Sequence, residues 1–339
     1  MKKKIFVVIV SLAVLILNSC NSNPVDSPPQ PGRRDYTWTI DEINPGQESL
    51  NLVRIWGISP SDVWAVGSSS WTATTIWHYN GVQWRCDSTS RNVQPFAIFG
   101  FSSNEVWLGN SNSTIWKYDG TKWYQFGEYK VTGFDRIDIN YFDGTSRKDI
   151  YCVGFADIYN SNTAKAIMLH YNGSDWSFVN IPTTKVSFET VAIDQSSGIL
   201  VMSGTVYDPA GFVAKVYCWD GKELKELLSD YGWSFVTKLG TEIFATLGSK
   251  IYKYNNWQLT LWKDNSGTGI NGNIICGRSR NDFFMKAQDG ITHFNGTDFE
   301  TLYTTNLTVE RGITFDKDVF FIGKNYSSGK NYIIHGQLK

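Results

Sequence analysis

Residues 55–67 of this chain read IWGISPSDVWAVG, and residues 76–84 read IWHYNGVQW. The first stretch holds two apolar segments around the short polar turn SPSD, and the second holds a third apolar segment, an Asn-Gly turn and Trp84. Asn-Gly between alternating strands is the strongest short-range hairpin signal, because a type I′ turn needs two residues at positive φ. We therefore predict four successive antiparallel strands in this part of the chain.

The same unit recurs along the chain. Residues 99–123 repeat it as FGFSSNEVWLGNSNSTIWKYDGTKW, and a third copy ends in HYNGSDW at residues 170–176. A seventh copy begins with VFFIG at residues 319–323 and runs to His335 and Gly336. The asparagine or aspartate of the turn recurs in six copies, as Asn80, Asp119, Asn172, Asp220, Asn255 and Asn295. Periods of roughly 40 to 50 residues with four strands each are typical of β-propellers, so we predict an all-β fold of seven four-stranded antiparallel blades.

The two ends of the repeat region complement each other. The seventh copy stops at Lys339 before its fourth strand, and residues 36–40 (YTWTI) form a lone strand at the other end. We predict that this N-terminal strand is the outer strand of the last blade and closes the ring, which removes a free sheet edge. Trp38 would then match the tryptophans that begin the other fourth strands, namely Trp84, Trp123 and Trp176.

The first residues are typical of an export signal. Lys2, Lys3 and Lys4 precede an apolar run over 5–17 that is too short to span a bilayer comfortably. The run ends in Leu-Asn-Ser-Cys at residues 17–20, which resembles the lipobox of bacterial lipoproteins. The resemblance implies that residues 1–19 are removed and that the Cys20 thiol carries a diacylglycerol.

Residues 20–34 contain four prolines among Ser, Asn and Gln, and have little to bury. We interpret them as a solvated tether that links a membrane to the propeller at 35–339. No Asp directly follows Cys20, which favours the outer membrane over the inner one. The expected location is therefore the cell envelope, with a lipid anchor in the outer membrane.

Two features of the repeat point to known families. The segment Asn80–Trp84 resembles a relaxed Asp-box, the BNR repeat of sialidase-like propellers. Residues 62–67 (DVWAVG) are similar to repeats in bacterial envelope lipoproteins and in propellers of the photosystem II assembly factor type. The resemblance covers roughly residues 35–339, and it implies the fold much more than a function.

Composition and isolated residues exclude several functions. The net charge is −1, so we expect no binding to nucleic acid, and there is no P-loop or nucleophile elbow. The four histidines occupy one repeat position in four different blades, so we predict no metal site and no cofactor. The cysteines of the repeat region should be small buried apolar residues, with a Cys152–Cys218 disulfide as the alternative. These cysteines are Cys86, Cys152, Cys218 and Cys276.

Carboxylates near the expected channel mouth are the only candidates for catalysis. They are Asp135, Asp138, Glu189 and Glu310. The Arg-Ile pairs at 54–55 and 136–137 lack the proline of the sialidase Arg-Ile-Pro motif. We therefore expect no enzyme, and the alternative is a glycoside hydrolase or polysaccharide lyase that uses these carboxylates.

The loops between second and third strands are longer than the other turns, over 68–74, 156–163, 206–213 and 324–330. Function concentrates on loops that a rigid scaffold carries, and exposed aromatic residues with arginines are typical of binding surfaces. The residues that we predict to bind a ligand are Trp71, Tyr159, Tyr207, Asp208, Tyr326, Arg54, Arg136 and Arg311. We predict a monomeric, non-enzymatic envelope protein that binds a protein or a glycan on this face. An assembly factor for an envelope complex is a further alternative.

Overall fold

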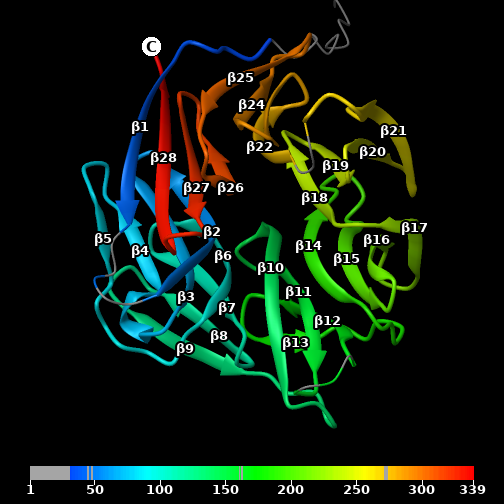
Figure 1. The fold of residues 1–339 in the computed structure, drawn as a ribbon. Coiled ribbons are helices and arrows are strands. Elements are labelled where there is room, and N and C mark those ends of the chain that lie inside the picture. Colours follow the sequence, from blue (N-terminus) through cyan, green and yellow to red (C-terminus); the bar gives the residue numbers. More distant parts are fainter. Residues whose placement is uncertain (1–30, 44–45, 47–48, 160, 162, 271–273) are drawn as a thin grey trace, which may run out of the picture.

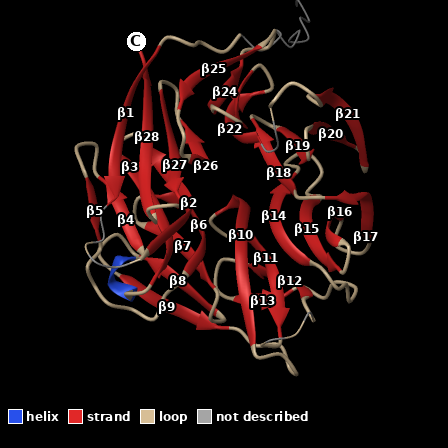
Figure 2. Cartoon of the chain, viewed as in Figure 1, coloured by secondary structure: helices blue, strands red, loops and turns tan. Residues whose placement is uncertain are grey.

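The computed structural model describes residues 31–43, 46, 49–159, 161, 163–270 and 274–339. The predicted signal peptide, Cys20 and most of the predicted tether lie outside these residues. The described residues form seven four-stranded antiparallel sheets, arranged as a ring of blades (Figure 1). Figure 2 shows that strands make up nearly all of the regular structure. The predicted seven-bladed propeller is confirmed.

Each blade runs from an inner strand beside the axis to an outer strand at the rim. Blades 1 to 3 consist of β2 (Leu50–Ser59), β3 (Asp62–Ser69), β4 (Ile76–Tyr79) and β5 (Trp84–Cys86); β6 (Pro95–Ser102), β7 (Glu105–Asn110), β8 (Thr114–Tyr118) and β9 (Trp123–Glu128); β10 (Arg136–Ser146), β11 (Asp149–Asp157), β12 (Lys165–Tyr171) and β13 (Trp176–Phe178). A single turn of 3₁₀-helix, η1 (Thr72–Thr74), lies between β3 and β4.

The remaining blades follow in chain order around the ring. Blades 4 to 6 consist of β14 (Ser187–Ile193), β15 (Leu200–Asp208), β16 (Gly211–Trp219) and β17 (Leu224–Tyr231); β18 (Ser234–Leu239), β19 (Glu242–Leu247), β20 (Lys250–Asn255) and β21 (Gln258–Asp264); β22 (Ile274–Ser279), β23 (Asp282–Ala287), β24 (Gly290–Phe294) and β25 (Phe299–Thr304). Blade 7 consists of β26 (Thr308–Thr314), β27 (Asp318–Asn325), β28 (Lys330–Leu338) and β1 (Tyr36–Ile43).

The N-terminal strand closes the ring as predicted. β1 pairs antiparallel with β28 over its whole length, and Trp38 lies opposite Gly336. In blades 1 to 3 the matching tryptophan lies opposite a tyrosine instead, as in the pair Trp84 and Tyr79. The Trp38 ring covers the place of that tyrosine side chain, because a Cβ built on Gly336 would lie 2.5 Å from the ring. Glycine at this position therefore admits the closing strand.

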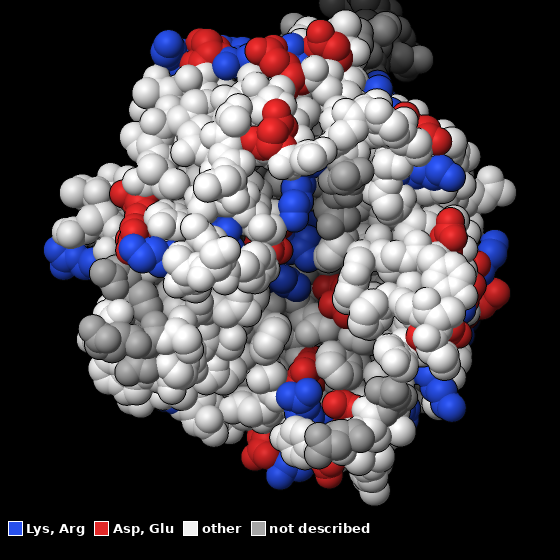
Figure 3. All heavy atoms as spheres, viewed as in Figure 1, with Lys and Arg blue, Asp and Glu red and all other residues white. Residues whose placement is uncertain are grey.

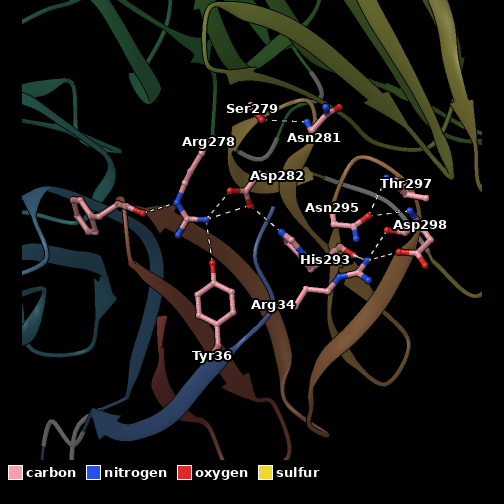
Figure 4. Close-up of polar contacts among 11 residues, drawn as sticks. Arg34, Tyr36, Arg278, Ser279, Asn281, Asp282, His293, Asn295, Thr297 and Asp298 are labelled. Carbon is pink, nitrogen blue, oxygen red and sulfur yellow. Dashed lines mark hydrogen bonds and ion pairs between the residues drawn. The ribbon is translucent and has the colours of Figure 1, made fainter. Parts of the chain in front are cut away.

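The residues before β1 attach to blade 6 (Figure 4). The Gly32 amide donates to the carbonyl of Asn281, and the Arg34 guanidinium donates to the carbonyl and the carboxylate of Asp298, each at 2.7 Å. The Tyr36 hydroxyl accepts a hydrogen bond from Arg278 of β22 at 3.0 Å. Gly32 and Arg34 belong to the predicted tether, so its last residues contact the propeller.

A paired acid and base recur in six of the seven blades. The acid begins the second strand of the blade, and the base lies on the third strand, opposite an aromatic residue in every case. Blades 1, 3, 6 and 7 use Asp62–His78, Asp149–His170, Asp282–His293 and Asp318–His335, each with Nε2 to Oδ1 at 2.8 Å. Blades 2 and 5 use Glu105–Lys117 at 3.2 Å and Glu242–Lys253 at 2.5 Å. The four histidines therefore lie in separate blades, and each already has a carboxylate partner.

The core lies between neighbouring blades and is rich in aromatic residues. Trp107 of blade 2 is fully buried, and its ring lies edge-on to Trp176 of blade 3, with the centroids 5.6 Å apart. Trp64 and Trp123 make the equivalent contact between blades 1 and 2 at 5.5 Å. Such aromatic contacts add to the free energy of simple burial, which helps to hold the blades together.

The Asn-Gly and Asp-Gly turns differ from the prediction. In the turn over residues 80–83 only Gly81 has positive φ, and the Asn80 side chain accepts hydrogen bonds from the amides of Val82 and Gln83. The same side-chain cap forms in blades 2, 3, 4 and 6. The type I′ prediction is therefore wrong for these four-residue loops, because the asparagine or aspartate cap replaces the second residue at positive φ.

The cysteines of the described chain are free thiols, so the alternative disulfide between Cys152 and Cys218 does not form. Cys152, Cys218 and Cys276 are buried, and Cys86 is half-buried. Burial raises the pKa of the Cys86 thiol to about 11. No helix among the described residues is long and apolar enough to cross a bilayer.

Candidate functional site

A β-bulge recurs at the same level of five inner strands, beside the central channel. The bulge adds an extra residue to the inner strand, opposite the end of the second strand. This extra residue changes the direction in which the neighbouring side chains of the inner strand point. The register shifts between Leu52 and Arg54, Pro95 and Ala97, Ile139 and Tyr141, Phe188 and Thr190, and Val309 and Gly312. Arg54 of blade 1 and Arg311 of blade 7 thereby occupy equivalent places on neighbouring inner strands.

Arg54 reaches across the channel. Its Nη2 donates to the carbonyl of Asn140 in blade 3 at 3.1 Å, and its guanidinium lies 5.6 Å from the Tyr141 ring centroid. Its Nε atom is buried without a hydrogen-bond partner. Burial, and then the charge of Arg311, lower the pKa of Arg54 to about 10. This arginine is therefore held in a site that disfavours its charge.

Arg311 crosses the channel from the other side. Its guanidinium lies 4.3 Å from the Phe235 ring centroid of blade 5, and blade 6 separates the two blades along the ring. Among the described residues no hydrogen bond or ion pair reaches this guanidinium. Burial lowers the pKa of Arg311 as well.

Two carboxylates and one ammonium group complete this cluster. Glu189 of blade 4 accepts a hydrogen bond from the Ser187 hydroxyl at 2.9 Å, and burial raises its pKa. Glu310 of blade 7 accepts a hydrogen bond from the Tyr326 hydroxyl at 2.7 Å. Lys324 donates to the Asn51 side chain at 2.5 Å, and burial lowers its pKa. The charges of Arg311, Glu189 and Glu310 act on the pKa of Arg54. The pKa of Lys324 likewise depends on Glu310 and on both arginines, so we treat these groups as one cluster. We call it the channel-mouth cluster: Arg54, Arg311, Lys324, Glu189 and Glu310.

The cluster carries more positive than negative charge, with three cations against two carboxylates. Figure 3 shows basic side chains gathered in the hollow at the centre of the ring. No ion pair within 4.0 Å joins either arginine of the cluster to a carboxylate in the described chain.

A second charged group lies on blade 3. The Arg136 guanidinium is 3.6 Å from both Asp138 and Asp157, and it lies 5.3 Å from the Tyr159 ring centroid. Burial, partly offset by Arg136, raises the pKa of Asp138 to about 7, and one of its oxygens is buried without a partner. The nearby charge of Glu189 contributes to this shift, which connects Asp138 to the channel-mouth cluster.

The other predicted site residues lie apart from this centre. Asp135 accepts a hydrogen bond from the Tyr159 amide, so it holds the loop after β11. Trp71 lies in the loop of blade 1 and is exposed. Tyr207 and Asp208 lie at the end of β15, and Tyr207 pairs with Phe212 in the ladder. Residues 206–213 are therefore a regular hairpin with a two-residue turn, and the prediction of a long loop over these residues is wrong because the strand pairing continues to Asp208.

Some surface residues were missed at the sequence level. Phe212 and Trp233 are exposed beside Tyr207, with the Phe212 and Trp233 rings 4.8 Å apart. Lys324 and Tyr141 line the centre near the arginines. Tyr141 could have been found from the repeat, because it occupies the bulge position of Arg54 in blade 3.

The channel also contains a cavity of about 320 Å³, lined by residues from all seven inner strands. There Asp143 is buried, accepts a hydrogen bond from the Ile193 amide, and pairs with Lys238 at 2.6 Å. This pair is satisfied within the chain. The described residues contain no cluster of three or more ligating side chains that could hold a metal ion.

Comparisons with known proteins support the fold. No family model matches the chain, and no curated protein is similar to it in sequence. Among solved structures, "YCF48 bound to D1 peptide" has a TM-score of 0.63 and 12% identity, over 92% of this chain and all of the other. The BBS1N chain in complex with ARL6DN has a TM-score of 0.57 and 11% identity, over 91% of this chain and 98% of the other. The WD40 propeller domain of Doa1 has a TM-score of 0.58 and 11% identity, over 88% of this chain and 97% of the other. At these identities the similarity shows the propeller fold alone.

Proposed function

We propose that this chain is a non-enzymatic scaffold that binds a protein partner at the channel mouth and the loops around it. The observation that carries the proposal is the channel-mouth cluster, where two arginines face the channel and neither forms an ion pair with a described residue. Exposed Tyr159 and Tyr326 lie next to charged groups of this centre. Aromatic residues and arginines on a rigid support are the usual anchors of protein interfaces. Two of the structures of similar fold contain a bound peptide or protein.

Site-specific photo-crosslinking tests this proposal. A photoreactive phenylalanine analogue replaces Tyr326 or Trp71 in the full-length chain, and cells are irradiated before extraction. We expect one discrete protein adduct from these positions. The matched control is Tyr124, an exposed aromatic residue on the outer strand β9, which should give none. Equal adducts from all three positions, or none from Tyr326 and Trp71, would contradict the proposal.

The proposal includes the cell envelope as the place of action, with a lipid on Cys20. The lipobox-like residues 17–20 and the basic and apolar segments before them support it. Metabolic labelling with palmitate should mark the wild-type chain and not a Cys20→Ala variant. Fractionation should place the labelled chain with the outer membrane, and recovery in the cytosol would contradict this part.

A second candidate function is glycan cleavage at Asp138. A glycosidase needs a carboxylic acid that stays protonated near neutral pH and a second carboxylate nearby. The pKa of Asp138, raised to about 7, and the neighbouring Glu189 favour this alternative. Turnover of a polysaccharide that is lost in both Asp138→Asn and Glu189→Gln would support it, and would displace the scaffold proposal.

A further inference from the structure

We infer that the channel-mouth cluster is a carboxylate site, in which Arg54 and Arg311 together bind an acidic group of a peptide segment of the partner. This inference rests on the proposed function and deepens it by naming the chemistry that the partner presents.

The positive charges of Arg54 and Arg311 destabilise the propeller when no anion is bound. Both arginines are half-buried, and the two charges lie close enough for Arg311 to lower the pKa of Arg54. Charges that are partly removed from water are normally paired, because a counter-ion offsets the loss of hydration. Structural arginines of the same chain follow this rule, since Arg278 pairs with Asp282 at 3.1 Å and Arg34 with Asp298 at 2.7 Å.

The carboxylates of the cluster do not meet this need. Glu189 and Glu310 are each hydrogen-bonded to a hydroxyl group, and neither lies within ion-pair distance of an arginine that the structure describes. The raised pKa of Glu189 brings it nearer to the neutral acid, which weakens it further as a counter-ion. Lys324 adds a third positive charge on the same side. The channel-mouth cluster therefore has an excess positive charge that one further carboxylate would neutralise.

The donors that remain fit a carboxylate. Arg54 keeps a buried Nε atom without a partner, and in the described part of the chain no hydrogen bond reaches the Arg311 guanidinium. Guanidinium groups bind the two oxygens of a carboxylate through parallel charge-assisted hydrogen bonds. Because the β-bulge puts both arginines at one level of neighbouring blades, one carboxylate could bridge them.

The carboxylate that binds here must belong to a narrow segment of the ligand. Arg54 touches blade 3 and Arg311 touches blade 5, so their side chains span the channel at this level. A glutamate or aspartate side chain, or a peptide C-terminus, is narrow enough to reach between them, whereas a sugar ring is wider. The aromatic rings of Tyr141 and Phe235 beside the guanidiniums exclude water and strengthen the charge interaction.

Three short peptides separate the possible sources of the carboxylate. The first is hexaglutamate with both ends blocked, the second is hexaglutamine with a free C-terminal carboxylate, and the third is hexaglutamine with both ends blocked. Binding to the full-length chain is measured by calorimetry and by the rise of the thermal unfolding midpoint at fixed ionic strength. We expect the first or second peptide to bind and the third not to bind.

The decisive variant is Arg311→Gln, because the Arg311 side chain makes no hydrogen bond with any residue that the structure describes. We expect the affinity for the acidic peptide to fall by about tenfold or more, the size of one charge-assisted hydrogen bond. The unfolding midpoint of the free variant should stay the same or rise, since the repulsion between two half-buried cations is relieved. Arg311→Lys should retain part of the affinity. Arg85→Gln, on the outer strand β5, is the matched control and should bind as the wild type does.

The inference is overturned if no acidic peptide binds, if all three peptides bind alike, or if Arg311→Gln binds as tightly as the wild type. It is also overturned if oligogalacturonate binds at this site and the peptides do not. Tyr326 and Trp71 crosslinks to a protein would then still stand. A failure of the carboxylate site is therefore distinguishable from a failure of the proposed scaffold function.

Discussion

Replacing Asp282 with Asn should destabilise the propeller much more than the same change at Asp62. Both residues begin the second strand of a blade and accept a hydrogen bond from a histidine Nε2 at 2.8 Å. The two sites differ in burial and in charge. His293 is fully buried, whereas the His78 side chain is 34% exposed. Asp282 also pairs with Arg278, which in turn holds Tyr36 of the closing strand (Figure 4).

The magnitudes follow from these environments. Removing the charge of Asp282 leaves the Arg278 cation, 19% exposed, without its counter-ion, and breaking a buried ion pair in this way costs about 3 kcal/mol or more. Among the described residues no arginine or lysine lies within ion-pair distance of Asp62, so Asp62→Asn only weakens its partly exposed hydrogen bonds with His78 and Trp64. That loss should cost about 1 kcal/mol. The expected difference between the two variants is therefore about 2 kcal/mol.

Urea unfolding of the full-length chain, followed by tryptophan fluorescence, measures both free energies of unfolding. Asp62→Asn serves as the control for the repeat position itself. Tyr36→Phe in the Asp282→Asn background should cost less than it does alone, because the two residues share Arg278. Equal losses for Asp282→Asn and Asp62→Asn would refute the reasoning from burial and charge.

Three further predictions concern titration, thiol chemistry and ring closure. Because burial raises the pKa of Asp138 to about 7, above its value of 3.8 in the unfolded chain, the folded state binds an extra proton between these values. Stability should therefore fall as the pH rises from about 4 to 7, by up to about 1.4 kcal/mol for each pH unit, and urea midpoints of Asp138→Asn should lack this part of the decline. Because burial raises the pKa of the thiols of Cys152 and Cys276, neither should react with iodoacetamide at pH 8 until urea unfolds the chain, and mass spectrometry would count the adducts; rapid labelling of the native chain would contradict their burial. Gly336→Ala should lower the free energy of unfolding by about 1 to 3 kcal/mol because its Cβ would collide with the Trp38 ring, and a Trp38→Leu background should reduce that loss; additive losses would argue against this contact.

The sequence repeat predicts the blades well, because each blade is built from contacts between segments close in the chain. The alternating apolar segments and the Asn-Gly turns mark the strands, and the missing fourth strand of the last copy predicts the pairing of Trp38 with β28. The exposed Trp71, Tyr159, Tyr207 and Tyr326 could be placed on loops or strand ends for the same reason.

Structural features that depend on the pairing register of the strands could not be predicted from the repeat. The bulge beside Arg54 arises from the pairing of β2 with β3, and the alternation of apolar and polar residues near Arg54 does not reveal it. The partner of His293 is Asp282, eleven positions away, so a histidine that looked isolated in the sequence belongs to a pair. The Asn80 cap similarly depends on a loop of four residues, one that the Asn-Gly dipeptide alone does not determine.

The closure by β1 has a consequence for how the molecule is made. Tyr36 is among the first residues of the propeller to leave the ribosome, and its ladder partner Leu338 is among the last. Until then the first strand has no sheet to join, while blades 1 to 6 can each form from neighbouring segments. Long-range pairings of this kind slow folding because the loop must close before the contact is gained. The ring therefore completes only after β28 has been synthesised, and a chain that loses this strand would also leave its first strand unpaired.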